Sequence, residues 1–507
     1  MIVLNVTYSV LSLMLAAYVV NALVLLVIYV SGRHKYAQRL RSEFRPVPES
    51  QWPTVTVQLP VYNEVDVIAR LIKSACNLDY PADKLQIQVV DDSTDETTLV
   101  AAQLVKQYQN RGVNICLVHR TNRVGFKGGA LREALNSATG EFIAIFDSDF
   151  VPRRDFLKSM IPYLVNNPEL GVVQSRWGHL NLEYSANTRA QALGIDAHFA
   201  VEQTARSMTG LYMNFNGSGG ILRREAILDA GNWQDDTVCE DLDLSYRAQL
   251  KGWKILYVPY VVSPAELPAQ VLAFKRQQFR WAKGSIQCAM KLWRSVIHAP
   301  ASHLKRASAI LHLTSYCTHL LLIASLLVLV PQLLWDARPV HWLAMFPVLT
   351  LIHPAMLVTA QATMYPDWKR RLLYLPIIMF LGTGLAVNSV FAIHEALTKR
   401  NHTFLRTPKF DLRGKRGQWH TSRYVLKLDR MFVFEILLGI YAIVGIIAAL
   451  NRGNYGTAAF VGIYAGGFIY IALAQLLQSL RYSERSWGAI WDSIAHPKKS
   501  LGSSRSD

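Results

Sequence analysis

The hydrophobic pattern divides the chain into long apolar runs and one long stretch that has none. Residues 1–32 carry no charge, and residues 9–30 are long enough to cross a bilayer as a helix, which takes about 20 residues. Further apolar runs lie at 307–335, 342–364, 373–394, 432–450 and 456–480. The first run is not typical of a signal peptide, because no positive residues precede it and no small-residue cleavage site follows. The block at about 47–300 is therefore predicted to be a soluble domain inserted after one membrane helix.

Within this block, short β-rich runs alternate with stretches of helical periodicity. The strand-like runs are 54–59, 87–91, 114–118 and 142–146, and the helical stretches are 64–78, 95–110 and 127–139. Alternation of strands and helices predicts a parallel sheet covered by helices. Ligands of such sheets bind at the carboxyl ends of the strands, so the residues that follow each strand are the candidates for a site.

Positive charge is concentrated beside the apolar runs. The net charge is +17, and residues 398–430 hold ten Lys or Arg against two Asp, while residues 33–45 hold five against one Glu. In a soluble protein this excess would suggest nucleic acid, but next to membrane helices it marks the cytoplasmic side and favours anionic lipid. We therefore expect membrane lipid, and no nucleic acid, among the partners. The five cysteines show no metal or disulfide spacing, which is typical of a reducing compartment.

Both basic segments are predicted on the cytoplasmic side, so the chain between 307 and 397 should cross the membrane an even number of times. Three apolar runs lie there, and one of them is expected to be interfacial or re-entrant. Residues 373–397 are the candidate, because this run contains Asn388 and Ser389 and ends in charged residues. The prediction is five spans, with an outside N-terminus and a cytoplasmic C-terminus; six spans are the alternative.

Acidic residues follow two of the predicted strands. Asp91 and Asp92 begin the stretch DDSTD, and Asp147 and Asp149 form the stretch DSD. Two carboxylates one residue apart can hold Mg²⁺ or Mn²⁺ and leave positions open for substrate phosphates. Alone, DSD is more typical of a solvated turn, and DDSTD is also typical of a helix N-terminus. Their common place at the strand ends of one sheet favours a site.

Glycine-rich stretches and a second acidic motif add further candidates. Lys127 lies in GFKGGALREAL, a loop that opens a helix and suits a phosphate, although a capped surface helix explains it equally well. Gly217 and Ser218 lie in NFNGSGGILRR, where glycines permit close approach of a ligand. Asp241 lies at a predicted helix start in CEDLDLSYRA. There a carboxylate would take a proton from an attacking hydroxyl or simply complement the helix dipole.

The stretch QQFRWAKGS, residues 277–285, gathers polar and aromatic residues shortly before an apolar run. By itself it is typical of an amphipathic helix at a membrane surface, with Arg280 reaching the headgroups and Trp281 in the aromatic belt. Its place after Asp241 and before the membrane also fits the lid of an active site.

The order of these motifs is specific. YNE, DDSTD, DSD, CED and QQFRW follow one another over 62–281, with one membrane helix before them and several after. This arrangement resembles the processive, membrane-integrated members of glycosyltransferase family 2, above all the cellulose-synthase-like mannan and glucan synthases of the A and C types. QSRWGHLN, FNGSGGILRR, AGNWQDDTVCEDLDLSYRAQLKGWK and PAELP carry the closest likeness, which covers roughly 50–300.

The resemblance implies a role for each candidate residue. Asp241, beside Glu240, would be the general base, and the pair that binds a divalent metal, Mg²⁺ or Mn²⁺, would be Asp147 and Asp149. The nucleotide-sugar donor would be bound by Tyr62, Glu64, Asp91, Asp92, Lys127, Asp147, Gln277 and Arg280. The acceptor would be met by Trp281, Gly217 and Ser218.

A downstream segment resembles the gating loop of cellulose synthases. In FLRTPK, Phe404, Thr407 and Lys409 match its pattern, whereas Arg406 stands where that family has valine. A basic juxtamembrane loop is the simpler interpretation of the same residues. Cys239 is a second departure, because cellulose synthases have threonine before the Glu-Asp pair.

For the fold, the resemblance implies an α/β glycosyltransferase A-type, Rossmann-like catalytic domain inserted in an α-helical transmembrane bundle. The predicted parts are an N-terminal transmembrane helix (1–32), a cytoplasmic glycosyltransferase domain with an interfacial helix (47–300), transmembrane and interfacial helices (305–397), a basic gating-like loop (398–430), two transmembrane helices (431–481) and a cytoplasmic tail (482–507).

The implied reaction is an inverting, metal-dependent transfer of a hexose from UDP-glucose or GDP-mannose to a growing β-linked polysaccharide, namely mannan, glucomannan or glucan. A lipid glucosyltransferase with a ceramide- or diacylglycerol-type acceptor shares DxD and Gln-x-x-Arg-Trp and is the alternative. A transporter or scaffold with a decayed domain is disfavoured, because every expected acid is present. The expected location is the bacterial inner (plasma) membrane, with the catalytic domain in the cytoplasm.

Overall fold

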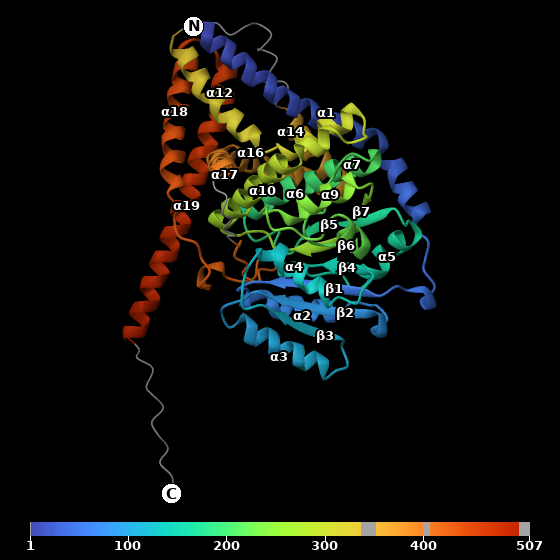
Figure 1. Ribbon diagram of the computed structural model, residues 1–507. Helices are drawn as coiled ribbons and strands as arrows, with labels where there is room; N and C mark the ends of the chain where they lie inside the picture. The colour runs from blue at the N-terminus through green and yellow to red at the C-terminus, as the bar shows by residue number, and fades with distance from the viewer. Residues whose placement is uncertain (1, 336–350, 399–405, 496–507) are drawn as a thin grey trace.

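The computed structural model describes residues 2–335, 351–398 and 406–495. Figure 1 shows an α/β domain in the lower part of the view and long helices above and beside it. Helix α1 (Ile2–Glu43) runs from the helical end of the molecule to the edge of the α/β domain, so one continuous helix connects the two parts.

The α/β domain is built on a seven-stranded sheet with the order β3-β2-β1-β4-β6-β5-β7. Its first four strands in the chain are parallel, and they are β1 (Val55–Val61), β2 (Leu85–Asp91), β3 (Ile115–His119) and β4 (Phe142–Ile145). They alternate with the helices α2 (Val65–Cys76), α3 (Thr97–Gln109) and α4 (Phe126–Asn136). The parallel α/β half predicted from the sequence is confirmed, with boundaries that differ by only a few residues.

Three further strands complete the sheet, and the sequence pattern did not predict them. β5 (Leu170–His179) and β7 (Lys254–Ala265) are parallel to each other, and β6 (Gly220–Arg223) runs antiparallel between β4 and β5. β6 lies at the end of the glycine-rich stretch NFNGSGGILRR, which shows no alternation of apolar and polar residues. The position of β6 depends on pairing instead, since Ile221 lies opposite both Ala144 and Val173.

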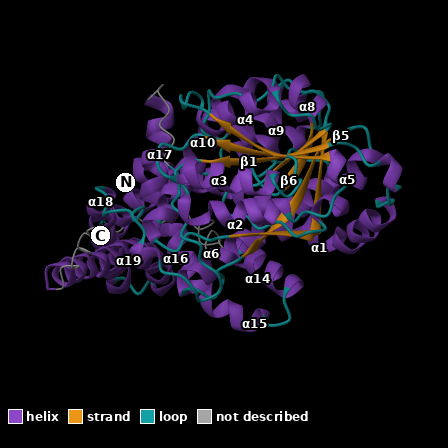
Figure 2. Ribbon diagram, turned by 90° about the horizontal axis from the view of Figure 1, so that it is seen from below, coloured by secondary structure: helices purple, strands orange, loops and turns teal. Residues whose placement is uncertain are grey.

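The strand β4 shows how the core is divided by the sheet. Successive side chains of a strand point to opposite faces. Phe142 and Ala144 contribute to the core on one face, which includes α2 and α5 (Phe156–Asn166), whereas Ile143 and Ile145 contribute to the core on the other face, which includes α4 and α9 (Glu240–Leu250). Strands buried on both faces are typical of parallel sheets covered by helices, and Figure 2 shows helices on both sides of the strands.

The α/β domain contains further helices beyond those named above. They are α6 (Ala186–Ala197), a π-helix η3 (His198–Gln203), α7 (Thr204–Thr209) and α8 (Arg224–Asp229). α6, η3 and α7 follow one another without a break and pack against α1 and α14 (Ile352–Met364). This segment therefore forms much of the contact between the α/β domain and the apolar helices.

The C-terminal half is helical. Its further elements are α10 (Val271–Ile297), α11 (His303–Leu313), α12 (Cys317–Leu334), α15 (Trp368–Arg371), α16 (Leu375–Gly384), α17 (Ala386–Thr398), α18 (Met431–Asn451) and α19 (Tyr455–Ala495). Among the described residues, five segments are long and apolar enough to cross a membrane: Ile2–Glu43, Cys317–Leu334, Trp368–Thr398, Met431–Asn451 and Tyr455–Leu480. The chain thus has the composition of an integral membrane protein.

Some boundaries differ from the predicted ones. α1 continues through its basic end to Glu43, and the backbone of α19 continues to Ala495. Residues 373–397, expected to be interfacial, form the broken helix α16–α17 within one of the five candidate spans. The predicted run 342–364 lies partly outside the described residues, and its described part includes α14. The number of spans and their sidedness stay predictions.

A buried ion cluster joins α10 to the apolar helices. Lys275 Nζ on α10 lies 2.7 Å from Glu435 Oε1 on α18 and 3.1 Å from Gln475 Oε1 on α19. Its backbone oxygen accepts a hydrogen bond of 3.0 Å from Asn388 Nδ2 on α17. Lys275 and Glu435 are both buried, and a buried charge is costly without its partner. The cluster therefore fixes α10 against three helices at once.

Replacing Lys275 by Met should destabilise the protein by about 3–5 kcal/mol, because Glu435 would remain buried without its cation. Thermal unfolding of the detergent-solubilised protein, followed by tryptophan fluorescence, measures this as a lower melting temperature. The double variant Lys275→Met/Glu435→Gln should regain part of the loss. Arg39→Gln removes a half-exposed partner of Glu43 and should change little. An unchanged melting temperature in Lys275→Met would contradict the role of the cluster.

Candidate active site

The site begins where the loops after β1 and β2 meet at the carboxyl edge of the sheet. Asn63 Oδ1 accepts a hydrogen bond of 2.8 Å from the backbone nitrogen of Thr94, and the Asn63 backbone nitrogen donates to Ser93 Oγ at 2.8 Å. This exchange holds Tyr62 and Glu64 against the DDSTD loop. The two loops belong to neighbouring parallel strands, which is why motifs far apart in the sequence meet here.

The two aspartates of the DDSTD stretch have different environments. Asp92 lines a cavity, and its carboxylate pairs with Arg120 through Nε at 2.7 Å and Nη2 at 2.5 Å. Asp91 is fully buried and does not line this cavity. Its carboxylate accepts hydrogen bonds from the Ser93 backbone nitrogen at 3.0 Å and from Thr98 Oγ1 at 2.6 Å. The structure thus places Asp91 as a support of the loop, outside the lining of the cavity.

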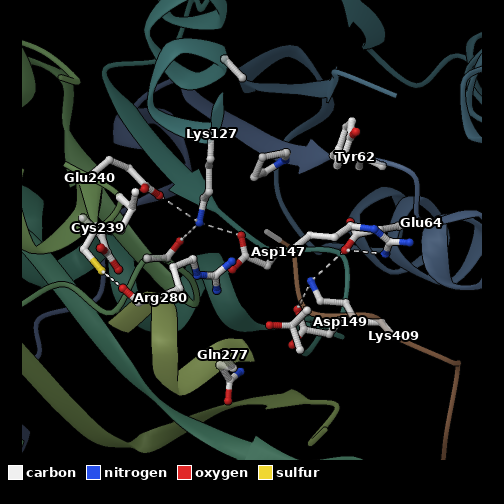
Figure 3. Close-up of a pocket in the computed structure, with 18 of the residues that line it drawn as sticks. Tyr62, Glu64, Lys127, Asp147, Asp149, Cys239, Glu240, Gln277, Arg280 and Lys409 are labelled. Carbon is white, nitrogen blue, oxygen red and sulfur yellow. Dashed lines mark hydrogen bonds and ion pairs between the residues drawn. The ribbon is translucent and has the colours of Figure 1, made fainter. Parts of the chain in front are cut away.

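The DSD stretch follows β4 and presents two carboxylates, each with a lysine beside it. Asp147 Oδ1 lies 2.7 Å from Lys127 Nζ, and Asp149 Oδ1 lies 2.9 Å from Lys409 Nζ. The Asp147 backbone nitrogen donates to Ser218 Oγ at 2.9 Å. Ser218 is fully buried, so its observed contact positions Asp147. Figure 3 shows both carboxylates with these lysines.

Lys127 connects the DSD loop to the Glu-Asp pair at the start of α9. Its Nζ donates to the Gly217 carbonyl oxygen at 2.9 Å and lies 3.6 Å from Glu240 Oε1. Gly217 has a positive φ of 78°, and a Cβ atom there would lie only 2.6 Å from Asp241 Oδ2. Only glycine lets this loop pass so close to Asp241. Figure 3 shows the Lys127 side chain between Glu240 and Asp147.

Helix α10 supplies another wall of the site through Gln277, Arg280 and Trp281. Spacings of three and four residues place these side chains on one helix face. One turn further on, a Cβ atom at Gly284 would overlap the Cys239 side chain and lie 3.0 Å from its backbone nitrogen. Glycine at this position therefore allows α10 to pack directly against the residue that precedes the Glu-Asp pair.

These side chains enclose a cavity of about 130 Å³, which we call the strand-end cavity. The predicted site residues that line it are Tyr62, Glu64, Asp92, Lys127, Asp147, Asp149, Gly217, Glu240, Asp241, Gln277, Arg280 and Trp281. Ligand pockets commonly measure about 300–1,000 Å³, so this one is small. Its lining also includes Arg406, Thr407 and Lys409, whose side chains take up part of the space.

The carboxyl groups of the strand-end cavity differ in acidity. Burial, followed by repulsion from Glu240, raises the pKa of Asp241 to about 7, although Lys127 and Arg280 act in the opposite direction. Burial also acts to raise the pKa of Asp147, but Lys127 and Lys409 outweigh it and the pKa is lowered. A carboxyl group with a pKa near neutrality is suited to accept a proton near physiological pH, so Asp241 fits a general base.

Three cations of the cavity were not among the predicted site residues: Arg123, Arg406 and Lys409. The Arg123 guanidinium lies 3.3 Å from the centroid of the Tyr62 ring. Lys409 and Arg406 could have been found from the FLRTPK segment, which resembles the gating loop of cellulose synthases. Phe404 of this segment lies outside the described residues. Nothing in the sequence marked Arg123 as a site residue, except that it lies close to Lys127 in the chain.

The glutamate of the PAELP stretch docks the segment that carries Lys409. Glu266 accepts hydrogen bonds from the backbone nitrogens of Phe410 at 2.8 Å and Leu412 at 3.1 Å. Arg70 Nη2 lies 3.1 Å from the same carboxylate, while Arg70 Nη1 binds Asp411 at 2.6 Å. The buried Glu266 thus joins the end of β7, helix α2 and residues 410–412.

The DSD carboxylates fit a divalent cation. Within the described part of the chain, no group of three or more His, Cys, Asp or Glu side chains is arranged to hold a metal ion. Two carboxylates on one turn still suit Mg²⁺ or Mn²⁺, which commonly take their remaining ligands from water and substrate phosphates. Asp149 and Glu64 both contact Lys409 Nζ, at 2.9 and 3.2 Å, so positive charge already compensates these acids.

Comparison with known proteins agrees with this site. Residues 53–284 match the family model described as glycosyltransferase like family 2. This segment belongs to glycosyltransferase family 2. It contains every motif from Tyr62 to Trp281, and the α/β A-type fold class with flanking long apolar helices is thereby confirmed.

Similar proteins match about half of the chain. Glucomannan 4-beta-mannosyltransferase 2 of Arabidopsis thaliana is 41% identical over 267 residues, which are 51% of this chain and 50% of that protein. Glucomannan 4-beta-mannosyltransferase 1 of Cyamopsis tetragonoloba is 41% identical over 297 residues, 57% of this chain and 56% of that protein. The chain thus spans about half the length of these curated relatives.

Among solved structures, the chain is similar to a mannosyltransferase from Pyrobaculum calidifontis in complex with GDP-Man and Mn²⁺. The sequence identity is 21% and the TM-score is 0.49, over 76% of this chain and all of that one.

Replacing Glu266 by Ala should release residues 410–412 from the domain, because two backbone nitrogens and Arg70 lose their acceptor. Limited trypsin digestion of the solubilised protein should then cut after Lys409 or Arg413 about tenfold faster, the change that roughly 1.4 kcal/mol produces. Glu169→Ala, which removes an exposed partner of Lys254, is the matched control. Equal cleavage rates in the two variants would show that Glu266 does not dock this segment.

Proposed function

We propose that the chain is an inverting glycan synthase that transfers mannose from a nucleotide sugar to a growing β-linked mannan or glucomannan. The observation that carries this proposal is the strand-end cavity, where Asp241 is held beside Lys127 and the DSD pair. The names of the relatives, which are glucomannan 4-beta-mannosyltransferases, support mannose and a polysaccharide acceptor. GDP-mannose and UDP-glucose are the donors to compare.

Asp241 would act as the general base. Its carboxylate would accept the proton of an acceptor hydroxyl as that oxygen attacks the anomeric carbon of the donor sugar. The bond from this carbon to the diphosphate breaks in the same step, and the electron pair leaves with the nucleoside diphosphate. Attack from the opposite side inverts an α-linked donor to a β-linked product without a covalent sugar–enzyme intermediate. Glu240 would assist by raising the pKa of Asp241.

The cations of the cavity would bind and stabilise the leaving diphosphate. Lys127 and Arg280 both act electrostatically on Asp147, so their charges meet at the DSD loop. A divalent cation held by Asp147 and Asp149 would supply further positive charge at the diphosphate oxygens. Preorganised charge of this kind stabilises a transition state because it needs no rearrangement during the reaction.

The acceptor would enter beside α10. Trp281 and Trp177 both line the cavity, and an aromatic ring offers a flat apolar face to a sugar. The same helix packs against α17 and α19, so this wall of the cavity is joined to the apolar helices. We place the catalytic domain on the cytoplasmic side because of the basic segments at 33–45 and 398–430. The relatives are plant proteins, so they do not support the expected bacterial membrane.

Membranes containing the protein, given labelled GDP-mannose or UDP-glucose with Mn²⁺ or Mg²⁺, test this function. Label from GDP-mannose should enter an alcohol-insoluble polymer that a β-mannanase degrades. Asp241→Asn should lower this rate by about 10²–10⁴-fold, because the acceptor proton loses its base, while binding of the donor persists. Label found only in the organic phase would refute the polymer acceptor and favour the lipid glucosyltransferase.

The rate should also depend on pH in a defined direction. Because the pKa of Asp241 is raised to about 7, the carboxylate form needed in a base is lost as the pH falls below that value. The kcat/KM for donor should therefore fall about tenfold per pH unit below 7 and level off above it. A profile that stays flat down to pH 5, measured by release of nucleoside diphosphate, would contradict the assignment of Asp241.

A further inference from the structure

A second cavity, of about 1010 Å³, lies where α1 meets the α/β domain, and we call it the interfacial cavity. It shares no lining residue with the strand-end cavity. The basic end of α1 forms one side of it, and parts of β5, β7 and the end of α14 form the others. Arg33, His34, Arg41, Arg176, Tyr260 and Thr363 are among the residues that line it.

The interfacial cavity is basic. Arg33 and Arg41 line it from α1 and Arg176 from β5, whereas no Asp or Glu is among its lining residues in the described chain. Arg33 Nε is buried and has no hydrogen-bond partner among the described residues. Arg176 donates from Nε to the Pro259 carbonyl oxygen at 3.1 Å, which fixes its side chain at the wall.

The interfacial cavity lies at the end of the first apolar run. Residues 1–32 carry no charge, and Arg33 is the first charged side chain of the sequence. Tyr29 and Thr363 share a hydrogen bond of 2.9 Å between their hydroxyl groups, so the end of α14 lies at the same level as this boundary. Both elements therefore reach the cavity from the apolar part of the molecule.

The stripe of α1 along the cavity changes from apolar to basic. His34, Ala37 and Arg41 line the cavity from one face of α1, and one turn before them the same face carries Val30, which lies outside the lining and is 53% exposed although it is apolar. An occupant with a negatively charged end and an apolar end would match both parts of the stripe. A free anion would use only the basic part.

We propose that the interfacial cavity binds the phosphate-bearing headgroup of an anionic membrane lipid. Arg33 and Arg41 would contact the phosphate, since guanidinium groups pair well with phosphate oxygens, and the acyl chains would lie along Val30 and the apolar face of α1. Basic pockets beside membrane helices bind anionic headgroups in this way. A lipid bound here would fill the space between α1 and the α/β domain and strengthen their contact.

Native mass spectrometry of the delipidated full-length protein in detergent tests the proposal, with phosphatidylglycerol and phosphatidylcholine as the lipid probes. Wild-type protein should bind phosphatidylglycerol more tightly than phosphatidylcholine. Arg33→Gln should weaken phosphatidylglycerol binding about fivefold, and Arg33→Gln/Arg41→Gln about 25-fold, if each charge contributes as basic residues near anionic lipid do. Lys35→Gln removes an exposed charge from the same helix outside the cavity and should change binding less than about twofold.

Three results would overturn the proposal. If Lys35→Gln weakened phosphatidylglycerol binding as much as Arg33→Gln does, the lipid would be attracted to the basic helix in general. If both lipids bound equally tightly, the cavity would not recognise the charge of the lipid. Inorganic phosphate that binds as tightly as phosphatidylglycerol would assign the interfacial cavity to a free anion. If Arg33→Gln does not fold, Arg41→Gln alone tests the same claim, because Arg41 is exposed near the end of α1 and should also cost about fivefold.

Discussion

The strand-end cavity depends on the compensation of crowded negative charge. Six acidic side chains line it, namely Glu64, Asp92, Asp147, Asp149, Glu240 and Asp241, and five cationic ones line it with them. Buried carboxylates repel one another, so the loops that carry them can meet only if cations reach between them. Lys127 and Lys409 do this from opposite directions, one from α4 and one from a segment far downstream. On the proposed function, the donor would bind together with a divalent cation. The charge of this cation cancels that of the donor diphosphate, so binding would leave the balance of acidic and basic charge in the cavity unchanged.

Helix α10 connects the charge of the cavity to the apolar helices. Its Arg280 acts on the carboxyl groups of Asp147 and Asp241, and about one and a half turns earlier its Lys275 is held by Glu435 of α18. Gly284 allows the same helix to pack directly on the residue before the Glu-Asp pair. One helix therefore contacts both the Glu-Asp pair and the apolar helices.

The sequence predicted the fold and the site best where a local hydrophobic pattern also fixed the place of a strand in the sheet. The four parallel strands and the acids that follow them were predictable because alternation with helices fixes which strand ends meet. The strand β6 was not, since its four residues depend on pairing with β4 and β5. Asp91 looked equivalent to Asp92, yet one is fully buried under the loop and the other faces the cavity. Arg123 and the docking role of Glu266 arise from contacts between distant segments, which no local pattern records.

The different acidity of Asp147 and Asp241 follows from where one ammonium group is held. Lys127 Nζ lies 2.7 Å from Asp147 Oδ1 and also donates to the Gly217 carbonyl oxygen, while Lys409 lowers the pKa of Asp147 further. Asp241 shares this cation but has Glu240 as its sequence neighbour, and burial and repulsion dominate there. Asp147 thus keeps its negative charge while Asp241 can exchange a proton near neutral pH. This division suits a site in which one carboxylate binds cations and the other accepts a proton.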